Sequence, residues 1–418
     1  MYDFANSGYT TVILTAVFNT YFVSVVAADL NGDNAGTATL VWTLAIAIAN
    51  ALVLLSAPIL GAIADYSAAK KRFLLISTSG CVLFTALLSL VGPGDVVLGV
   101  TLVILATVMF SAGENFIAAF LPELVPPEKM GQLSGLGWTI GYLGGLIALG
   151  LCYGYIVWAQ GQGQSASDYI PVTNLIIAAL FAFAAAPTFL WLQERAVASK
   201  KQHLEGYVRI GFRRLRETLH HARHYRDFLR FLVVLAIYNA GIYTVIILAA
   251  VYAQEVMGFE ANETLMLILI VNITAAAGAF IFSLIQDRIG SKNAVAISLL
   301  IWVLAIAVAY GATTKSAFWM AANLIGIAMG ASQSAGRALI GQFSPPSRSG
   351  EFFGLWGLAI KLAAIIGPIT YGATNYVVEG DHRSAILSTL GFFVAGLLLL
   401  LSVNEKRGRE AAKVDHWD

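Results

Sequence analysis

Several polar side chains lie inside long apolar stretches of this chain, where such side chains are costly. A carboxyl, Glu114, stands next to Asn115, and two cations, Arg337 and Lys361, lie in other apolar stretches. A charged residue at the centre of a bilayer costs about 2.5–3.5 kcal/mol on insertion scales, so it usually marks a pathway for protons, ions or solutes. A carboxyl at that depth is protonated or paired, which suits proton coupling by Glu114. An ammonium there needs a partner or water, which suits a working role for Lys361.

Each of these polar residues also has a simpler explanation. Amides within spans often only hydrogen-bond neighbouring helices, and this alternative stays open for Asn19, Asn115 and Asn239. Arg337 lies near enough to one end of its stretch to reach the membrane surface, so topology or latching are alternatives to solute binding. The sequence alone does not separate these roles.

The composition places these residues in a membrane protein. Hydrophobic residues make up 58% of the 418 residues and charged residues 12%, whereas soluble domains have roughly 25% charged residues. The mean hydropathy of +0.76 points the same way. A helix crosses the bilayer with about 20 apolar residues. Runs of that length predict twelve spans, at roughly 8–29, 38–63, 73–92, 96–120, 131–157, 172–192, 231–253, 263–285, 294–312, 317–340, 350–377 and 384–402.

The charges predict the orientation of these spans. With the N-terminus in the cytoplasm, every Lys and Arg outside the spans falls in a cytoplasmic segment except Lys315 and Arg383, and Lys361 and Arg337 lie within spans. The positive-inside rule therefore predicts that both termini are cytoplasmic. The connection 193–230 is the long polar one, and apolar residues at helical spacing within 204–219 oppose a row of arginines. We expect a basic amphipathic helix on the inner membrane face, which serves as a linker or binds lipid or a partner.

A long-range repeat divides the chain into two halves. Pro126 and Pro127 recur as Pro345 and Pro346 (345 − 126 = 219), and a cation and two glycines follow each pair at the same offset. An internal repeat indicates the overall architecture more reliably than a local motif does. We therefore predict a six-helix bundle at 1–192, the linker at 193–230, a second six-helix bundle at 231–402 and a cytoplasmic tail at 403–418.

Two loops carry a familiar pattern. The segment 61–72, Gly-Ala-Ile-Ala-Asp-Tyr-Ser-Ala-Ala-Lys-Lys-Arg, resembles the cytoplasmic loop motif of the major facilitator superfamily, and 287–292 is a shorter copy in the second half. Tyr66 and Ala68 depart from the pattern, which has a basic residue and a glycine there. The resemblance implies a latch between the halves on the cytoplasmic side. We predict that it consists of Asp65, Lys70, Lys71, Asp287, Arg288 and Lys292.

Further motifs narrow the resemblance to one branch of that superfamily. They are Tyr2-Asp3-Phe4-Ala5-Asn6-Ser7-Gly8, Leu121-Pro122-Glu123, the segment 134–138, Ser332-Gln333-Ser334 with Arg337, and Glu351-Phe352-Phe353-Gly354. Together they resemble the vacuolar amino-acid effluxers linked to autophagy and their bacterial relatives. Members of that branch usually carry a short polar segment before the Tyr-Asp pair, so we expect the native chain to begin earlier.

The resemblance implies an all-α major facilitator fold of two pseudo-repeated six-helix bundles that work by alternating access. Spans one, four, seven and ten would line a central cavity. The predicted solute-binding residues are Asn19, Asn115, Asn239, Gln333, Arg337 and Lys361, with Glu114 as the proton-coupling residue. We expect a secondary active transporter, by symport or efflux, of a small polar or zwitterionic solute such as an amino acid or peptide. Transport of a larger amphiphile (a drug, siderophore or cell-wall fragment) and a non-transporting sensor or scaffold remain alternatives.

Other chemistry lacks its sequence signals. All six histidines lie outside the predicted spans, and Cys81 and Cys152 are isolated, so we predict neither a metal site nor a disulfide. The phosphate-loop, zinc-protease and serine-hydrolase motifs do not occur, so we expect no cofactor and no enzyme activity. The distribution of the basic residues is explained by the membrane topology, so we expect no nucleic-acid partner. We predict a monomer in the bilayer of a bacterial cytoplasmic membrane.

Overall fold

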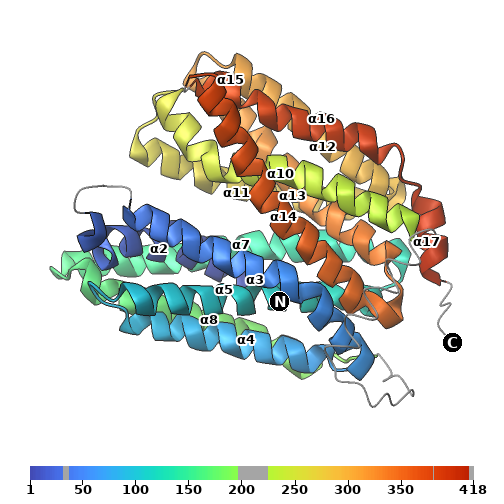
Figure 1. Cartoon of the computed structure of the whole chain (residues 1–418), viewed down its shortest axis with the longest axis horizontal. Coiled ribbons are helices and arrows are strands. Elements are labelled where there is room, and N and C mark those ends of the chain that lie inside the picture. The colour runs from blue at the N-terminus through green and yellow to red at the C-terminus, as the bar shows by residue number, and fades with distance from the viewer. Residues whose placement is uncertain (32–36, 196–224, 380, 414–418) are drawn as a thin grey trace. The chain divides into compact units, whose positions relative to one another are not determined.

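The computed structural model describes residues 1–31, 37–195, 225–379 and 381–413, and helices dominate these ranges (Figure 1). Within them, eleven helical stretches are long and apolar enough to cross a bilayer. Helix α13, Lys315–Phe343, is a further helix of 29 residues. Its polar residues, among them Gln333 and Arg337, lower its hydropathy. With α13 included, the prediction of an all-α protein with twelve membrane helices is confirmed.

The first half of the chain begins with an irregular span. Two π-helical segments, Tyr9–Ala16 and Phe22–Val26, interrupt the α-helical winding, and the backbone breaks at Val17 between them. The span predicted at roughly 8–29 is present, but it starts earlier, at Tyr2, and winds unevenly. The α-helices here are α1 (Tyr2–Gly8), α2 (Phe18–Tyr21), α3 (Thr37–Ser67), α4 (Lys70–Leu87), α5 (Val96–Ala119), α6 (Leu121–Leu124), α7 (Met130–Gly161) and α8 (Ala166–Trp191).

The second half follows the same order with longer regular helices. Besides α13, they are α10 (Arg226–Glu255), α11 (Ala261–Ile289), α12 (Ser291–Gly311), α14 (Ser349–Val377), α15 (His382–Ala385), α16 (Leu387–Leu400) and α17 (Glu405–Lys413). The amphipathic helix predicted within 204–219 lies outside the described residues. Short 3-10 turns at Pro127–Lys129 and Pro346–Arg348 precede α7 and α14, so both copies of the proline repeat start a long helix in the same way.

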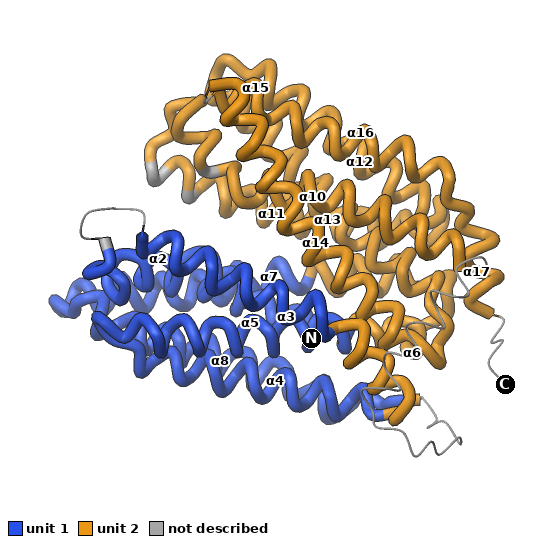
Figure 2. The backbone as a smooth tube through the Cα atoms, viewed as in Figure 1, with its two compact units in different colours: residues 1–56, 69–117, 140–194 blue, residues 57–68, 118–139, 195–418 orange. Residues whose placement is uncertain are grey.

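The chain divides into two compact units, which Figure 2 colours separately. Unit 1 comprises residues 1–56, 69–117 and 140–194, and unit 2 comprises 57–68, 118–139 and 195–418. Unit 2 therefore holds the C-terminal half together with the last turns of α3 and the connection from α5 to α7. These two short pieces come from the first half of the sequence repeat and pack with helices of the second.

Aromatic side chains fill the core of unit 1 around its irregular first span. Phe22 packs on Trp42 with ring centroids 5.3 Å apart, and Tyr9 stacks on Phe110 at 5.1 Å. The hydroxyl groups of Tyr9 and Thr107 lie 2.9 Å apart. The buried hydroxyl thus keeps a hydrogen bond, as burial of a tyrosine requires.

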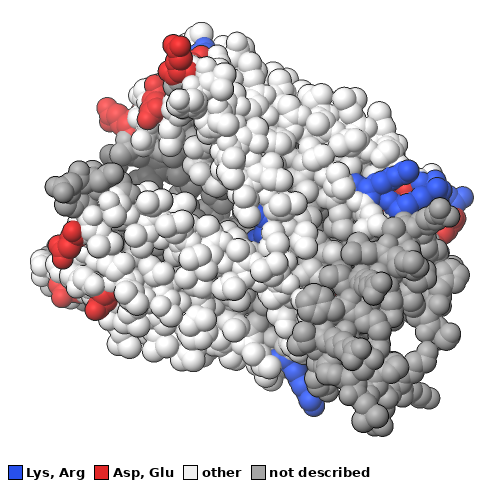
Figure 3. Space-filling view, viewed as in Figure 1, with Lys and Arg blue, Asp and Glu red and all other residues white. Residues whose placement is uncertain are grey.

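The core of unit 2 contains a close helix approach and a buried aromatic pair. A Cβ at Gly330 of α13 would overlap the backbone of Ala275 in α11, so only glycine permits this approach. Trp302 is fully buried, stacks on Phe393 at 4.7 Å and donates its indole N–H to the Ser332 hydroxyl at 3.2 Å. On the face seen in Figure 3, acidic side chains of this unit gather at its α15 end and basic side chains at its α17 end.

Candidate functional site

Asp65, the carboxylate of the first loop motif, binds the start of α14. Its two carboxylate oxygens accept the backbone N–H groups of Gly350, at 3.0 Å, and Glu351, at 2.8 Å. The first N–H groups of a helix have no partner within the helix and form the positive end of its dipole. Asp65 is only 5% exposed, so this charged cap is well shielded from water.

Asp287, in the second loop motif, makes the corresponding contact with α7. It accepts the backbone N–H groups of Gly131 and Gln132, both at 2.9 Å. Gly131 and Gln132 correspond to Gly350 and Glu351 at the repeat offset (350 − 131 = 219). Unit 2 thus contains the same aspartate cap twice, each joining a segment of one half of the repeat to a segment of the other.

The two caps differ in their surroundings. Arg348 and Glu351 form an ion pair of 2.8 Å beside the Asp65 cap, and their side chains are 5% and 0% exposed. The repeat places Gln132 where Glu351 stands, so the α7 cap has no matching carboxylate at that position. The Asp65 cap is also the more buried of the two, since Asp65 is 5% exposed and Asp287 is half-buried.

Each aspartate precedes a tight turn. Gly290, three residues after Asp287, has a φ of +87°, which glycine adopts freely. Ala68, three residues after Asp65, has a φ of +45°. This is the position where the loop motif has glycine. Ala68 thus adopts the left-handed conformation although its Cβ makes that conformation unfavourable.

The cations of the loop motifs bind the ends of other helices. Lys71 donates its ammonium group to the carbonyl of Leu192, and Lys292 donates to that of Val403, both at 2.6 Å. These contacts satisfy carbonyls after α8 and α16. Lys70 is fully buried and Arg288 is exposed. The described side-chain contacts of Lys71 and Lys292 are with these carbonyls, and the place of both lysines in the latch stays a prediction.

Two glutamates complete the arrangement, and the sequence interpretation missed both. Glu194 accepts the backbone N–H groups of Lys70, at 2.7 Å, and Lys71, at 3.2 Å. Glu405 accepts those of Ser291, at 3.2 Å, and Lys292, at 2.9 Å. Each glutamate stands two residues after the carbonyl that accepts the lysine ammonium group. The segments 192–195 and 403–406 share only the order of an apolar residue, an amide, an acid and a cation, which is a short signal for this pair.

Arg337 connects α13 to the start of α7. Its Nε donates to the Ser134 hydroxyl at 3.1 Å, and its Nη2 donates to the Ser134 carbonyl at 2.9 Å. The guanidinium also lies over the ring of Trp138, 5.4 Å from its centroid. The motif at 134–138 therefore contacts the motif that ends at Arg337. The latching alternative for Arg337 fits these contacts.

The other predicted residues of unit 2 are distributed over three helices. Asn239 of α10 donates to the Leu235 carbonyl at 2.9 Å, within its own helix. Gln333 of α13 and Lys361 of α14 are half-buried. The contact of Asn239 is a structural one, and the solute-binding roles of all three stay predictions.

In unit 1, Glu114 and Asn115 lie on α5 against the first span. A Cβ at Gly113 would overlap the Tyr2 hydroxyl, which lies 2.9 Å from the Thr78 hydroxyl and within electrostatic range of Asp3 and Glu114. Glu114 is half-buried and Asn115 is 8% exposed. Asn19 lies just after the break at Val17. Tyr2 and Thr78 were not among the predicted residues, although buried hydroxyls beside a carboxyl suit proton transfer.

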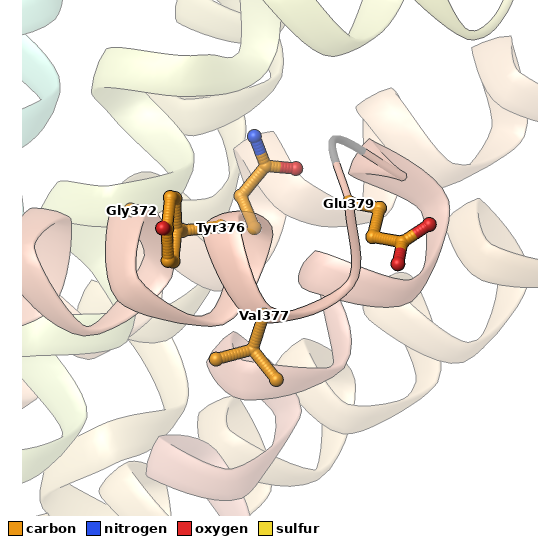
Figure 4. Close-up of a pocket in the computed structure, with 5 residues that line it drawn as sticks. Gly372, Tyr376, Val377 and Glu379 are labelled. Carbon is orange, nitrogen blue, oxygen red and sulfur yellow. The ribbon is translucent and has the colours of Figure 1, made fainter.

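A pocket of about 720 Å³ lies at the far end of α14, and its described lining residues are Gly372, Asn375, Tyr376, Val377 and Glu379. Figure 4 shows the side chains of Tyr376, Val377 and Glu379 pointing in different directions. A solute site needs polar groups that converge, so we do not assign this pocket a binding role. No cluster of three or more metal-ligating side chains occurs in the described part of the chain.

The sequence matches a known family over almost its whole length. The family described as "Vacuole effluxer Atg22 like" matches residues 30–132 and 126–413. The chain belongs to this family. This Atg22-like chain is 28% identical over 415 residues to the uncharacterized MFS-type transporter YxiO of Bacillus subtilis, covering 99% of this chain and 95% of that protein. It is 24% identical to autophagy-related protein 22-1 of Aspergillus niger over 67% of this chain and 48% of that protein.

Solved structures of transporters share the fold of the Atg22-like chain. The human organic anion transporter MFSD10 superposes with a TM-score of 0.74 at 15% identity, covering 96% of this chain and 97% of that one. The proton:xylose symporter XylE superposes with a TM-score of 0.70 at 17% identity, covering 99% and 96%. Identities this low establish the fold alone, which is that of the major facilitator superfamily. Together with the family match, they confirm an integral membrane transporter of that superfamily.

Proposed function

We propose that this chain is a secondary active transporter that moves a small polar or zwitterionic organic solute, an amino acid or a short peptide, without changing it chemically. The paired aspartate caps of unit 2 carry this proposal. Asp65 holds the start of α14 and Asp287 holds the start of α7. Each cap joins one half of the repeat to the other, so both must break when the halves separate on that side.

The strength of the caps suits a reversible gate. Hydrogen bonds to a charged group contribute about 1.5–3 kcal/mol each, and part of that returns when water replaces the helix N–H groups. Each cap therefore stabilises the closed state by a few kcal/mol. The difference in binding free energy of a solute between two conformational states is of the same order. The caps are therefore strong enough to close the path and weak enough to open in every cycle.

The orientation follows from the charges at the helix ends. The caps lie at the ends that carry Lys70, Lys71, Lys292 and α17, which the positive-inside rule assigns to the cytoplasm. We propose that both termini are cytoplasmic and that the membrane is the cytoplasmic membrane of a bacterium. The long match to a Bacillus subtilis protein supports the bacterial assignment.

The energy source that we propose is a proton gradient acting through Glu114. The carboxyl is half-buried on α5, and the Tyr2 hydroxyl lies against the adjacent Gly113. A protonated carboxyl crosses the membrane interior at far lower cost than a carboxylate. Proton binding at Glu114 would thus favour the change of conformation, and Lys361 and Arg337 would meet the carboxylate of the solute.

A larger amphiphilic anion is the second candidate solute, because α14 exposes an apolar stripe beside Lys361. Leu362, Ile365, Ile366 and Ile369 are 38%, 36%, 41% and 64% exposed. A cation next to such a stripe fits an anion with an apolar body. MFSD10, which shares the fold, is described as an organic anion transporter.

Transport by the purified protein in proteoliposomes tests the proposal. We expect labelled amino acids to accumulate when an inward or outward proton gradient is imposed, and expect the accumulation to disappear with a protonophore. Glu114→Gln should retain counterflow but lose the response to the gradient. Glu410→Gln, on the exposed surface of α17, is the control and should behave as the parent. Accumulation of amphiphilic anions alone would favour the second candidate, and no transport of either class would leave a scaffold role.

A further inference from the structure

Ser134, Trp138 and Arg337, here called the inner clasp, form the contact between α7 and α13. Ser134 accepts hydrogen bonds from the guanidinium at its hydroxyl and its carbonyl, at 3.1 and 2.9 Å. The same hydroxyl donates to the Ser334 carbonyl at 2.8 Å. One serine thus accepts two hydrogen bonds from α13 and donates one to it.

The residues around the inner clasp are buried in unit 2. Ser134, Ser334, Ala335 and Ala338 are all 0% exposed, and Arg337 is half-buried among them. Hydrogen bonds are electrostatically stronger in such surroundings than in water. The positive charge of Arg337 is therefore sensitive to any stronger acceptor that reaches it.

The repeat gives the inner clasp no counterpart. At the offset of 219, Arg337 corresponds to Ala118, Ser134 to Phe353 and Trp138 to Gly357. Otherwise the two sides are built alike, with an aspartate cap and close helix packing: a Cβ at Gly61 would overlap the Gly350 carbonyl, and a Cβ at Gly135 would overlap Ser283. Closure of the path needs only an aspartate cap and close packing, so the added guanidinium serves another purpose.

The chemistry of a guanidinium indicates that purpose. Its planar fork of N–H donors matches a carboxylate, and hydrogen bonds between two charged groups are roughly twice as strong as neutral ones. The Ser134 hydroxyl and carbonyl are neutral acceptors. A carboxylate that reaches Arg337 would therefore compete well with Ser134.

We propose that Arg337 recognises the carboxylate of the transported solute, and that this carboxylate displaces Ser134 from the guanidinium. Displacement removes two of the three described hydrogen bonds between Ser134 and α13, so the solute itself loosens the start of α7. The cation–π contact with Trp138 keeps the guanidinium in place. Its N–H groups can then exchange the Ser134 oxygens for the carboxylate oxygens of the solute. This inference rests on the proposed transport function and names its substrate class, a solute with a free carboxylate.

A distance measurement tests the displacement directly. Nitroxide labels at Glu128→Cys and Lys406→Cys, both on exposed positions of unit 2, report the distance from the start of α7 to α17 in a protein whose Cys81 and Cys152 are replaced by alanine. An equimolar mixture of the proteinogenic L-amino acids should lengthen this distance in part of the population. The mixture of their methyl esters should not, because the ester has lost the charge.

Variants of the inner clasp give the second readout. Ser134→Ala should show the lengthened distance without any amino acid. Arg337→Lys keeps the charge but loses the fork, so the KM for amino-acid uptake should rise at least about tenfold and the distance response should vanish. Arg383→Lys is the matched control. Arg383 lies in α15 and donates to the carbonyl of Ala312, just after α12, at 2.7 Å, so it makes an arginine–carbonyl contact that does not involve α7.

The outcomes separate the inner clasp from transport itself. Uptake of amino acids with parental KM and parental distances in Arg337→Lys overturns the role of Arg337 and leaves the proposed function standing. Uptake and a distance change that are equal for acids and methyl esters overturn the carboxylate assignment. Absence of both uptake and distance change in the parent overturns the proposed function and the inner clasp together.

Discussion

Glu194 and Glu405 do the same work in the two units: each carboxylate accepts the first two backbone N–H groups of the helix that follows a loop motif. Glu194 caps α4 in unit 1, and Glu405 caps α12 in unit 2. The Glu405 cap fixes the start of α12 four residues after Asp287. Arg409 binds Glu405 and also acts electrostatically on Asp287, so α17 helps to position the α7 cap.

The Glu405 cap should be measurable as stability. Glu405→Ala removes the acceptor of the first two backbone N–H groups of α12 and the partner of Arg409. Loss of a helix cap lowers the free energy of unfolding by about 0.5–2 kcal/mol. We expect a lower midpoint of thermal unfolding in detergent. Glu410→Ala, an exposed residue of the same helix, is the control. Equal midpoints for both variants would mean that the cap contributes no stability.

The Asp65 cap should set the balance between open and closed states. Asp65→Asn keeps the size of the side chain but loses its charge, so the open population should rise at least about tenfold. Nitroxide labels at Ser67→Cys and Lys413→Cys, both in unit 2, would report longer distances. Asp168→Asn, which caps α8 through Ser165, is the control. Identical distance distributions in Asp65→Asn and parent would remove the cap from the gate.

The turn at Ala68 should be improved by the residue that the loop motif has there. A left-handed conformation costs an L-residue about 1–2 kcal/mol and glycine very little, so Ala68→Gly should raise the free energy of unfolding by about 1 kcal/mol. Ala69→Gly is the control, because Ala69 has a φ of −127° and glycine gains nothing there. The midpoints of chemical unfolding compare the two. A destabilised Ala68→Gly would show that the left-handed turn is not strained.

Lys361 should be needed for transport and not for folding. Lys361→Met makes α14 more apolar, so expression should stay near the parental level, while uptake should fall at least about tenfold, a loss of roughly 1.4 kcal/mol. Lys361→Arg should restore only part of the rate, because the two cations differ in shape and hydration. Lys315→Met is the control, since Lys315 binds Glu263 at 2.6 Å on the exposed surface and holds the pKa of that carboxyl below its usual value. Parental uptake by Lys361→Met would make Lys361 structural.

The orientation can be tested with single cysteines in the variant that lacks Cys81 and Cys152. A cysteine at Ser165, before α8, should react with a membrane-impermeant thiol reagent added to intact cells. A cysteine at Lys406, in α17, should react only after the membrane is permeabilised, because the positive-inside rule places it in the cytoplasm. The reverse pattern would invert the topology.

The sequence predicted the helices well because apolar length and the proline repeat are local signals. It did not predict the π-helical winding of Tyr9–Ala16, since the residues there differ little from those of an ordinary span. It singled out Asp65 and Asp287 as latch residues but not what they bind: their described acceptor contacts are with backbone N–H groups, which every helix start offers. A partner of that kind leaves no trace in residue identity.

Contacts between distant motifs were equally hidden. The segment 134–138 and Arg337 each stood out as a motif, yet only the packing of α7 on α13 shows that Ser134 and Arg337 bond to each other. Glu194 and Glu405 were missed for another reason. They lie in polar segments after the spans, where a search for apolar periodicity finds nothing.

The uneven winding of the first span has a consequence for Asn19. An α-helix turns by 100° per residue, and a π-helical segment holds an additional residue in its widened turns. Rewinding Tyr9–Ala16 as α-helix would therefore rotate everything after it by roughly 100°. Asn19 lies just beyond this segment, so the direction of its side chain depends on whether Tyr9–Ala16 winds as π-helix or as α-helix.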